Sequence, residues 1–360
     1  MNYFLLNFVV AAISVITTIA GIGGSCFYIP IYCLLEKKSI TQSIPITLVT
    51  IFGDSLVRFF FLVFKKHPLS KNRYLINMPL VLLLSAFDSN SSFFGIILNN
   101  YLSNKVKGLI LTIILSITFI KSVQKSYFIF KEEKKNKENI TLLSIDGISY
   151  LIPNNHIIEY SEEKKIDYIK NIFVLIVVLT CVNIFIYCQN IFSSYKFFIM
   201  TLQFIFVYLF GDKFSKYLIT DYENKKNNNF IFLPDDMKWN KINIFKLITI
   251  GSVCGFISTT FGIGGSMLLL PILINIGLSP YIAIACTSVT SFISSISSCY
   301  NYALHGMIDY HYALPLALSS GIGSFIGLIL SEKLKLFKRQ YILSFLISIL
   351  LLLSIILINV

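Results

Sequence analysis

Residues 21–35 read GIGGSCFYIPIYCLL, and residues 262–276 read GIGGSMLLLPILINI. The two stretches are identical at seven of fifteen positions, which include the glycine pattern, the serine and the Pro-Ile pair. Both lie inside long apolar segments. A glycine in a helix interior costs about 1 kcal/mol relative to alanine. Three glycines within five residues therefore predict an interrupted helix, and the duplication indicates two related halves.

The similarity continues on both sides of this motif. TLVT at 47–50 corresponds to TSVT at 287–290, MPL at 78–80 to LPL at 314–316, and SFFG at 92–95 to SFIG at 324–327. Each half is therefore expected to be a unit of four apolar segments, and the fifth and sixth segments are an insert between them.

The composition is that of a membrane protein. Only 13% of the residues are charged and 55% are hydrophobic, whereas a soluble domain carries about a quarter charged residues. Apolar segments long enough to cross roughly 30 Å of hydrocarbon recur along the chain. They fall at about 3–35, 41–64, 74–98, 106–128, 169–190, 195–210, 244–275, 280–304, 310–331 and 339–359. The first segment runs directly into GIGG without a cleavage site, so it is interpreted as a span and not as a signal peptide.

These segments predict an all-α polytopic membrane protein with about ten transmembrane segments. The expected organisation is a first repeat at 1–130, a polar loop at 131–168, a central helix pair at 169–210, a polar loop at 211–243 and a second repeat at 244–360. The net charge of +12 comes from Lys and Arg between the spans, which favours contact with lipid headgroups over nucleic acid. Their distribution predicts cytosolic termini, although the basic loop at 333–339 opposes this orientation.

The duplicated break is the candidate functional site. Backbone N–H groups freed inside a membrane need partners, and paired interruptions in two halves are typical of a transporter's binding site. The N-terminus of the helix that follows each break favours a small anion. Close helix packing through small residues is the alternative. The candidate binding residues are Gly21, Gly23, Gly24, Ser25, Thr47, Thr50, Gly262, Gly264, Gly265, Ser266, Thr287 and Thr290, with Pro30 and Pro271 as further helix-breaking residues.

Three charged residues lie within apolar segments of the first half. Asp54 and Arg58 are four residues apart on one helical face, and Asp88 lies in the third segment. A charge at this depth costs at least about 2.5–3.5 kcal/mol, so it is normally paired or functional. Asp54 and Arg58 form a self-neutralising pair in one interpretation. In the other, Arg58 attracts an anion while Asp54 or Asp88 carries a proton, and the second half shows no matching charges.

The sequence offers no catalytic residue, metal site or cofactor motif. The seven cysteines fall in apolar segments without metal-ligand spacing, and neither HExxH nor GxSxG occurs. A membrane-embedded enzyme is therefore disfavoured. A receptor or scaffold would explain the polar loops but not the duplicated break. A homo-oligomer is compatible with the sequence.

Both copies of GIGGSxxxxP resemble the duplicated G-x-G-G-G-x-x-x-x-P signature of the TauE/SafE family of sulfite exporters, also called TSUP anion permeases. Residues 244–331 are similar to the family's second half, and 195–209 resembles the extra central helix pair of its eukaryotic branch. The resemblance implies a helical transporter of sulfite, organosulfonates or other small anions. Two features depart from the family pattern: Ser25 and Ser266 replace its last glycines, and SAFDSN at 85–90 replaces a glycine-rich helix.

Overall fold

The computed structural model describes residues 3–21, 24–135, 161, 165–233 and 235–334, with short pieces at 144–145, 148–149, 349 and 352–356. Within these residues, seven helices are long and apolar enough to cross a membrane, and three shorter apolar helices accompany them. The predicted all-α, multi-pass membrane fold is confirmed. Most of the tenth predicted segment, at 339–359, lies outside the described residues.

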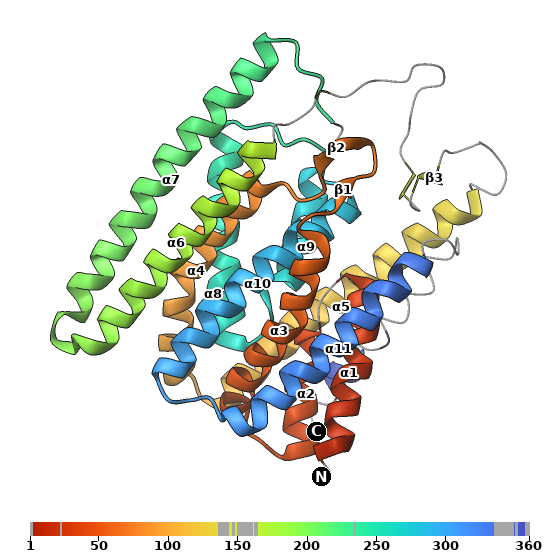
Figure 1. Ribbon diagram of the computed structural model, residues 1–360. Helices are drawn as coiled ribbons and strands as arrows, with labels where there is room; N and C mark the ends of the chain where they lie inside the picture. Colours follow the sequence, from red (N-terminus) through yellow and green to blue (C-terminus); the bar gives the residue numbers. More distant parts are fainter. Residues whose placement is uncertain are drawn as a thin grey trace. The chain divides into compact units, whose positions relative to one another are not determined.

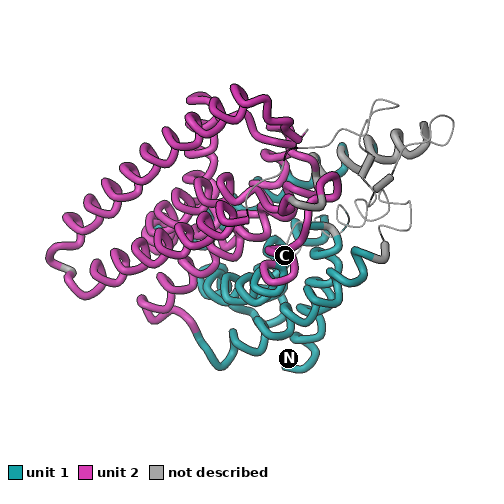
Figure 2. Tube along the Cα trace, turned by 45° about the horizontal axis from the view of Figure 1, so that its top comes forward, with its two compact units in different colours: residues 1–58, 101–157, 309–360 teal, residues 59–100, 158–308 magenta. Residues whose placement is uncertain are grey.

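The chain divides into two compact units, coloured separately in Figure 2. Unit 1 comprises Met1–Arg58, Tyr101–Ile157 and Asp309–Val360. Its elements are α1 (Tyr3–Ala20), α2 (Ser25–Glu36), most of α3 (Ile40–Leu62), α5 (Asn104–Lys135), the short strands β3 (Ser144–Ile145) and β4 (Ile148–Ser149), and α11 (Tyr310–Leu334). All of them except β4 are labelled in Figure 1.

Unit 2 comprises Phe59–Asn100 and Ile158–Ile308. Its elements are the hairpin of β1 (Lys66–His67) and β2 (Ser70–Tyr74), α4 (Met78–Tyr101), α6 (Lys165–Ile191), the 3-10 turn η1 (Ser193–Tyr195), α7 (Lys196–Asn227), α8 (Lys241–Phe261), α9 (Gly265–Ile276) and α10 (Pro280–Leu304).

In unit 1, α1 and α11 pack closely because glycines replace larger side chains at their contact. A Cβ atom on Gly323 would lie 2.3 Å from the carbonyl oxygen of Ala11. A Cβ atom on Gly327 would lie 2.7 Å from the carbonyl oxygen of Val15 and 2.9 Å from Cβ of Thr18. Small residues four apart let two membrane helices approach backbone to backbone.

In unit 2, α4 and α8 make the equivalent contact. A Cβ atom on Gly95 would lie 2.8 Å from the carbonyl oxygen of Phe256 and from Cβ of Thr259. A Cβ atom on Gly255 would lie 2.2 Å from the carbonyl oxygen of Asp88. Gly95 corresponds to Gly327 in the repeat, so the same helix pairing occurs once in each unit.

This pairing exchanges one helix between the repeats. Unit 1 joins α1 of the first repeat to α11 of the second, and unit 2 joins α8 of the second repeat to α4 of the first. The compact units therefore differ from the two sequence repeats. Unit 1 combines the first segment of the first repeat with the third segment of the second repeat. Unit 2 combines the first segment of the second repeat with the third segment of the first repeat.

The inserted helix pair α6 and α7 belongs to unit 2. The side-chain amide of Gln189 donates to Gln203 at 2.7 Å, and Gln203 donates to Asn90 of α4 at 2.9 Å. All three side chains are buried. The rest of the pair is largely exposed, as expected for helices that face lipid. The helix predicted to end near residue 210 continues to Asn227, so this part of the expected polar loop is helical.

A polar cluster joins the β1–β2 hairpin to the segment before α8. Arg73 donates two hydrogen bonds to Asp236, at 2.8 and 2.9 Å. Nδ1 of His67 accepts from the Leu69 amide at 3.1 Å, and its Nε2 lies 3.8 Å from Asp235. Burial, reinforced by Arg73, lowers the pKa of His67 to about 4. Burial raises the pKa of Asp235. His67 is therefore uncharged at neutral pH.

Candidate functional site

The first GIGGS motif interrupts the helix in unit 1. α1 ends at Ala20, Gly21 adopts φ +74°, and α2 begins at Ser25 with Gly24 as its N-cap. Positive φ is the left-handed region that glycine enters without steric cost. No side chain caps the N-terminus of α2. Gly23 lies outside the described residues.

The second motif repeats this geometry in unit 2. α8 ends at Phe261, Gly262 adopts φ +66°, and α9 begins at Gly265 with Gly264 as its N-cap. Again no side chain caps the helix. The N-termini of both half-helices thus present backbone N–H groups in buried surroundings, the arrangement that favours an anion. Pro30 and Pro271 both lie inside the helices that follow the breaks.

Buried hydroxyl groups of unit 1 lie on α2 and α3. Oγ of Ser25 and Oγ1 of Thr47 are buried and have no hydrogen-bond partner among the described residues. The hydroxyl of Tyr28 stands so close to Gly24 that a Cβ there would lie 2.3 Å from it, and it faces the Ser14 hydroxyl. Unsatisfied buried hydroxyls are costly, so a ligand able to accept from them would be stabilised.

The other predicted threonines use their hydroxyls locally. Thr50 donates to the Ile46 carbonyl and contacts the Tyr32 hydroxyl at 2.8 Å. Thr287 and Thr290 donate to carbonyls of their own helix, at 3.1 and 2.9 Å. Ser266 is buried beside Gly265 at the start of α9. Thr47 is thus the one of the four threonines whose hydroxyl is unsatisfied in the described part of the chain.

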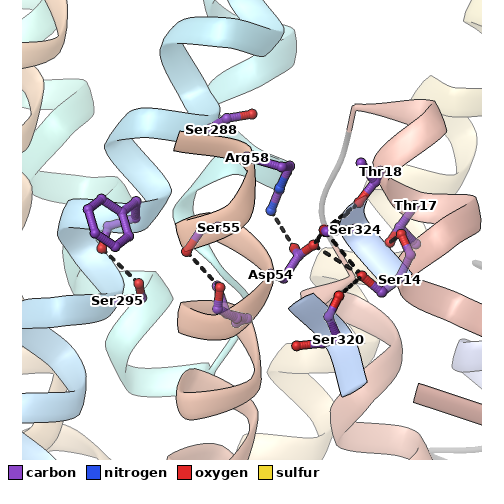
Figure 3. A network of polar contacts seen from close by, with 12 residues as sticks. Ser14, Thr17, Thr18, Asp54, Ser55, Arg58, Ser288, Ser295, Ser320 and Ser324 are labelled. Carbon is purple, nitrogen blue, oxygen red and sulfur yellow. Dashed lines mark hydrogen bonds and ion pairs between the residues drawn. The ribbon is translucent and has the colours of Figure 1, made fainter. Parts of the chain in front are cut away.

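Asp54 is the centre of a buried polar network in unit 1 (Figure 3). Its carboxylate accepts from Arg58 at 2.5 Å, from Ser14 at 3.1 Å and from Thr18 at 3.3 Å. Ser324 of α11 also donates to it. Asp54 and Arg58 therefore form the ion pair that their spacing predicts, and three hydroxyls complete the shell of the carboxylate.

Arg58 is less completely satisfied than its partner. Its side chain is 2% exposed, and one Nη2 hydrogen bond joins it to Asp54. Its Nε and Nη1 have no hydrogen-bond partner among the described residues. The pair therefore keeps unused donors on its cationic side, which is compatible with both interpretations of Arg58.

Asp88 occupies a corresponding place in unit 2. Its carboxylate is buried, and a Cβ atom on Gly265 would lie 3.5 Å from Oδ1. Ser294 of α10 faces it, and Oδ2 has no hydrogen-bond partner within the described ranges. The carboxylate thus lies in front of the N-terminus of α9.

The repeat register shows that each of the two acids corresponds to a serine in the other repeat. Thr50 corresponds to Thr290, so Asp54 corresponds to Ser294 on α10. In the same way, Gly95 of α4 corresponds to Gly327 of α11, so Asp88 corresponds to Ser320. Consistent with this register, Ser14 donates to the Ser320 carbonyl, and its counterpart Gly255 contacts the Asp88 carbonyl. Among the described residues, each unit therefore holds one buried acid within its spans, Asp54 on α3 in unit 1 and Asp88 on α4 in unit 2.

Sequence reasoning did not single out Ser14, Thr18, Tyr28 or Ser324. The repeat register carries a signal for the network around Asp54. Extending the TLVT and TSVT correspondence by one helical turn aligns Asp54 with Ser294. Among the described residues, no group of three or more His, Cys, Asp or Glu side chains could hold a metal ion.

Two equivalent broken helices inside a multi-pass helical membrane protein define the class as a membrane transport protein. Residues 247–359 match the family model described as Sulfite exporter TauE/SafE. The match lies in the second half of the chain and agrees with the resemblance that the duplicated motif indicates.

Curated relatives extend the similarity beyond the second half. Sulfite exporter TauE/SafE family protein 2 of Arabidopsis thaliana is 23% identical over 98% of this chain and 81% of its own length. Family protein 1 of the same plant is 22% identical over 97% of this chain and 80% of its own length. Probable membrane transporter protein YunE of Bacillus subtilis (strain 168) is 30% identical over 24% of this chain and 33% of its own length. No solved structure gives a significant match.

Proposed function

We propose that the chain is a secondary transporter or permease for a small oxyanion, such as sulfite or an organosulfonate, that works by alternating access of its two repeats. The main support is the uncapped N-terminus of α2, which begins at the buried, unsatisfied hydroxyl of Ser25. The names of the relatives add support for sulfite as the first anion to test.

The α2 N-terminus supplies neutral donors suited to an oxyanion. Ser25, Tyr28 and Thr47 each contribute an O–H, and the first turn of α2 contributes N–H groups along its dipole. Neutral donors hold an anion without a permanent counter-charge, so the anion can leave again. The free donors of Arg58, in the same unit, add a long-range attraction.

The transport assay uses proteoliposomes and labelled sulfite, sulfate and thiosulfate. Thr47→Val removes one donor and keeps the shape of the side chain. We expect it to raise the anion concentration at half-saturation by about tenfold, since a hydrogen bond to a charged group contributes roughly 1.5–3 kcal/mol. Gly264→Leu should abolish transport, because a large side chain would fill the N-terminus of α9.

Thr112→Val is the matched control, because Thr112 on α5 donates only to the Gly108 carbonyl. It should transport like the wild type. If no anion moves in the wild type, or if Thr47→Val and Gly264→Leu both transport normally, the breaks serve packing alone. A receptor or scaffold role would then be favoured.

A further inference from the structure

Asp88 differs from every other acid in the described spans by its surroundings. In unit 1, Asp54 has an arginine and three hydroxyl donors. Asp88 faces the Ser294 hydroxyl, the Cys254 thiol and the start of α9, and it forms no ion pair among the described residues. The position that corresponds to Arg58 in unit 2 is Ser298, which bonds to Thr259.

The groups around Asp88 supply no compensating cation. Among the described residues, Cys254 of α8 is the titratable side chain that faces it, and the facing residues of α9 and α10 are Gly265 and Ser294. On α4 itself, Ser91 bonds to the Asp88 carbonyl and leaves the carboxylate alone. A buried carboxylate without a cation is much less costly when it takes up a proton.

We propose that Asp88 carries the coupling proton, so that an anion binds at the α9 break together with a proton. This inference rests on the proposed anion transport. The carboxylate stands in front of the helix N-terminus that would receive the anion, at 3.5 Å from a Cβ position on Gly265. The ionised acid repels an incoming anion, and the protonated acid accepts it.

A proton fits this place better than a metal cation. The N-terminus of α9 carries a positive partial charge, which repels Na⁺ and attracts the ionised Asp88 as well as the substrate anion. Protonation of Asp88 therefore leaves this helix terminus to the anion. No second carboxylate or histidine near Asp88 completes a metal site in the described part of the chain. A protonated Asp88 could donate its O–H to Ser294 or to the bound anion.

Asp54 is unsuited to the same task. Its carboxylate is held by Arg58 at 2.5 Å and by three hydroxyl groups, which all favour the ionised form. Binding a proton there would leave Arg58 without its counter-charge. The two opposite charges of the pair are therefore fixed, and Asp88 is the group that changes charge.

Thermodynamic linkage gives the proposal a sign. If the proton favours the anion, the anion favours the proton by the same free energy. Anion affinity then falls as pH rises through the titration of Asp88, at most about tenfold per pH unit for one proton. Transport of one anion moves one proton in the same direction.

The test measures binding and uptake of labelled sulfate and methanesulfonate across the neutral pH range, in proteoliposomes. Neither anion titrates in that range, so the pH dependence reports the protein. In Asp88→Asn, we expect affinity to lose its pH dependence and an imposed proton gradient to stop driving uptake. Asp212→Asn is the control, because Asp212 is exposed and pairs with Lys216. It should behave like the wild type.

A swap variant separates coupling from damage to the fold. Asp88→Ser combined with Ser294→Asp moves the carboxylate to the place that Asp54 takes in unit 1, and it should restore pH-dependent affinity. Infrared difference spectra of the purified protein give a readout independent of transport. The wild type should show the carbonyl band of a protonated carboxylic acid, and Asp88→Asn should lack it.

The outcomes distinguish the two proposals. If the wild type moves no anion, the proposed function fails, and the infrared band alone decides whether Asp88 takes up a proton. If anions move but Asp88→Asn keeps the wild-type pH dependence, or a Na⁺ gradient drives uptake instead, the proton-carrying role of Asp88 is overturned.

Discussion

Unit 1 and unit 2 contain the same helix break and the same glycine-mediated helix pair, yet they treat a buried acid differently. Asp54 in unit 1 is surrounded by an arginine and three hydroxyls. Asp88 in unit 2 has one oxygen without a partner among the described residues. A duplicated scaffold can therefore surround one buried acid with partners and leave the other with an unsatisfied oxygen.

The comparison predicts a large loss of stability when a charge is removed in unit 1 and a small one in unit 2. Arg58→Gln leaves Asp54 buried without a cation, which should lower the free energy of unfolding by about 3–5 kcal/mol. Asp88→Asn should change it much less, because it leaves no buried charge without a partner. Unfolding by SDS titration in mixed micelles measures both.

A double variant checks that the loss comes from the unpaired, buried charge of Asp54. Asp54→Asn combined with Arg58→Gln removes both charges and should recover much of the stability lost in Arg58→Gln. Equal losses in Arg58→Gln and Asp88→Asn would contradict the difference between the units.

The shared helix pairing predicts matched effects of overpacking. Gly255→Ala and Gly323→Ala each place a methyl group 2.2–2.3 Å from a carbonyl oxygen of the partner helix. Each should cost about 1–3 kcal/mol of unfolding free energy, in the same titration. Gly108→Ala is the control, since its methyl group would meet only the end of the Ile40 side chain at 3.3 Å. It should be neutral or stabilising.

The equivalence of the two breaks predicts similar strain at their glycines. Gly21→Ala and Gly262→Ala put a Cβ at φ +74° and +66°, which should cost on the order of 1 kcal/mol each. Asparagine tolerates this conformation better, so Gly262→Asn should cost less than Gly262→Ala. A large loss at one break alone would show that the second has a different backbone requirement.

Acid sensitivity should reside in unit 2. Because the pKa of His67 is lowered to about 4, the unfolded chain binds a proton between about pH 6.5 and 4 that the folded chain does not. Stability from this residue is therefore full above about pH 6.5 and is lost as pH falls toward 4. His67→Gln should flatten this part of the stability curve, measured by thermal unfolding. An unchanged curve would mean that His67 is protonated without penalty.

The sequence was a good guide to elements that depend on local signals. Glycine spacing located both breaks, and the four-residue spacing of Asp54 and Arg58 predicted a contact that one helical turn enforces. The end of α7 was misjudged because its continuation past residue 210 is rich in charged and polar residues, although Phe214, Tyr217 and Leu218 keep an apolar side.

The exchange of α4 and α11 between the repeats could not be derived from composition or periodicity. Which helix contacts Gly95 or Gly327 depends on tertiary packing, and both helices carry small and polar residues that do not specify the partner helix. The second half of the sequence has no acid that matches Asp54. Unit 2 obtains its acid, Asp88, from the first half of the sequence because α4 packs there. The hydroxyls of Thr287 and Thr290 were likewise predicted as donors, but they bond to their own helix.

The amide chain from Gln189 through Gln203 to Asn90 has an evolutionary consequence. Without α6 and α7, the Asn90 amide would face hydrocarbon with no acceptor or donor, which is strongly unfavourable. Acquisition of the helix pair and appearance of a polar residue on α4 are therefore mutually dependent events. Across homologues, an amide at this position should co-vary with the presence of the inserted pair, and an apolar residue with its absence.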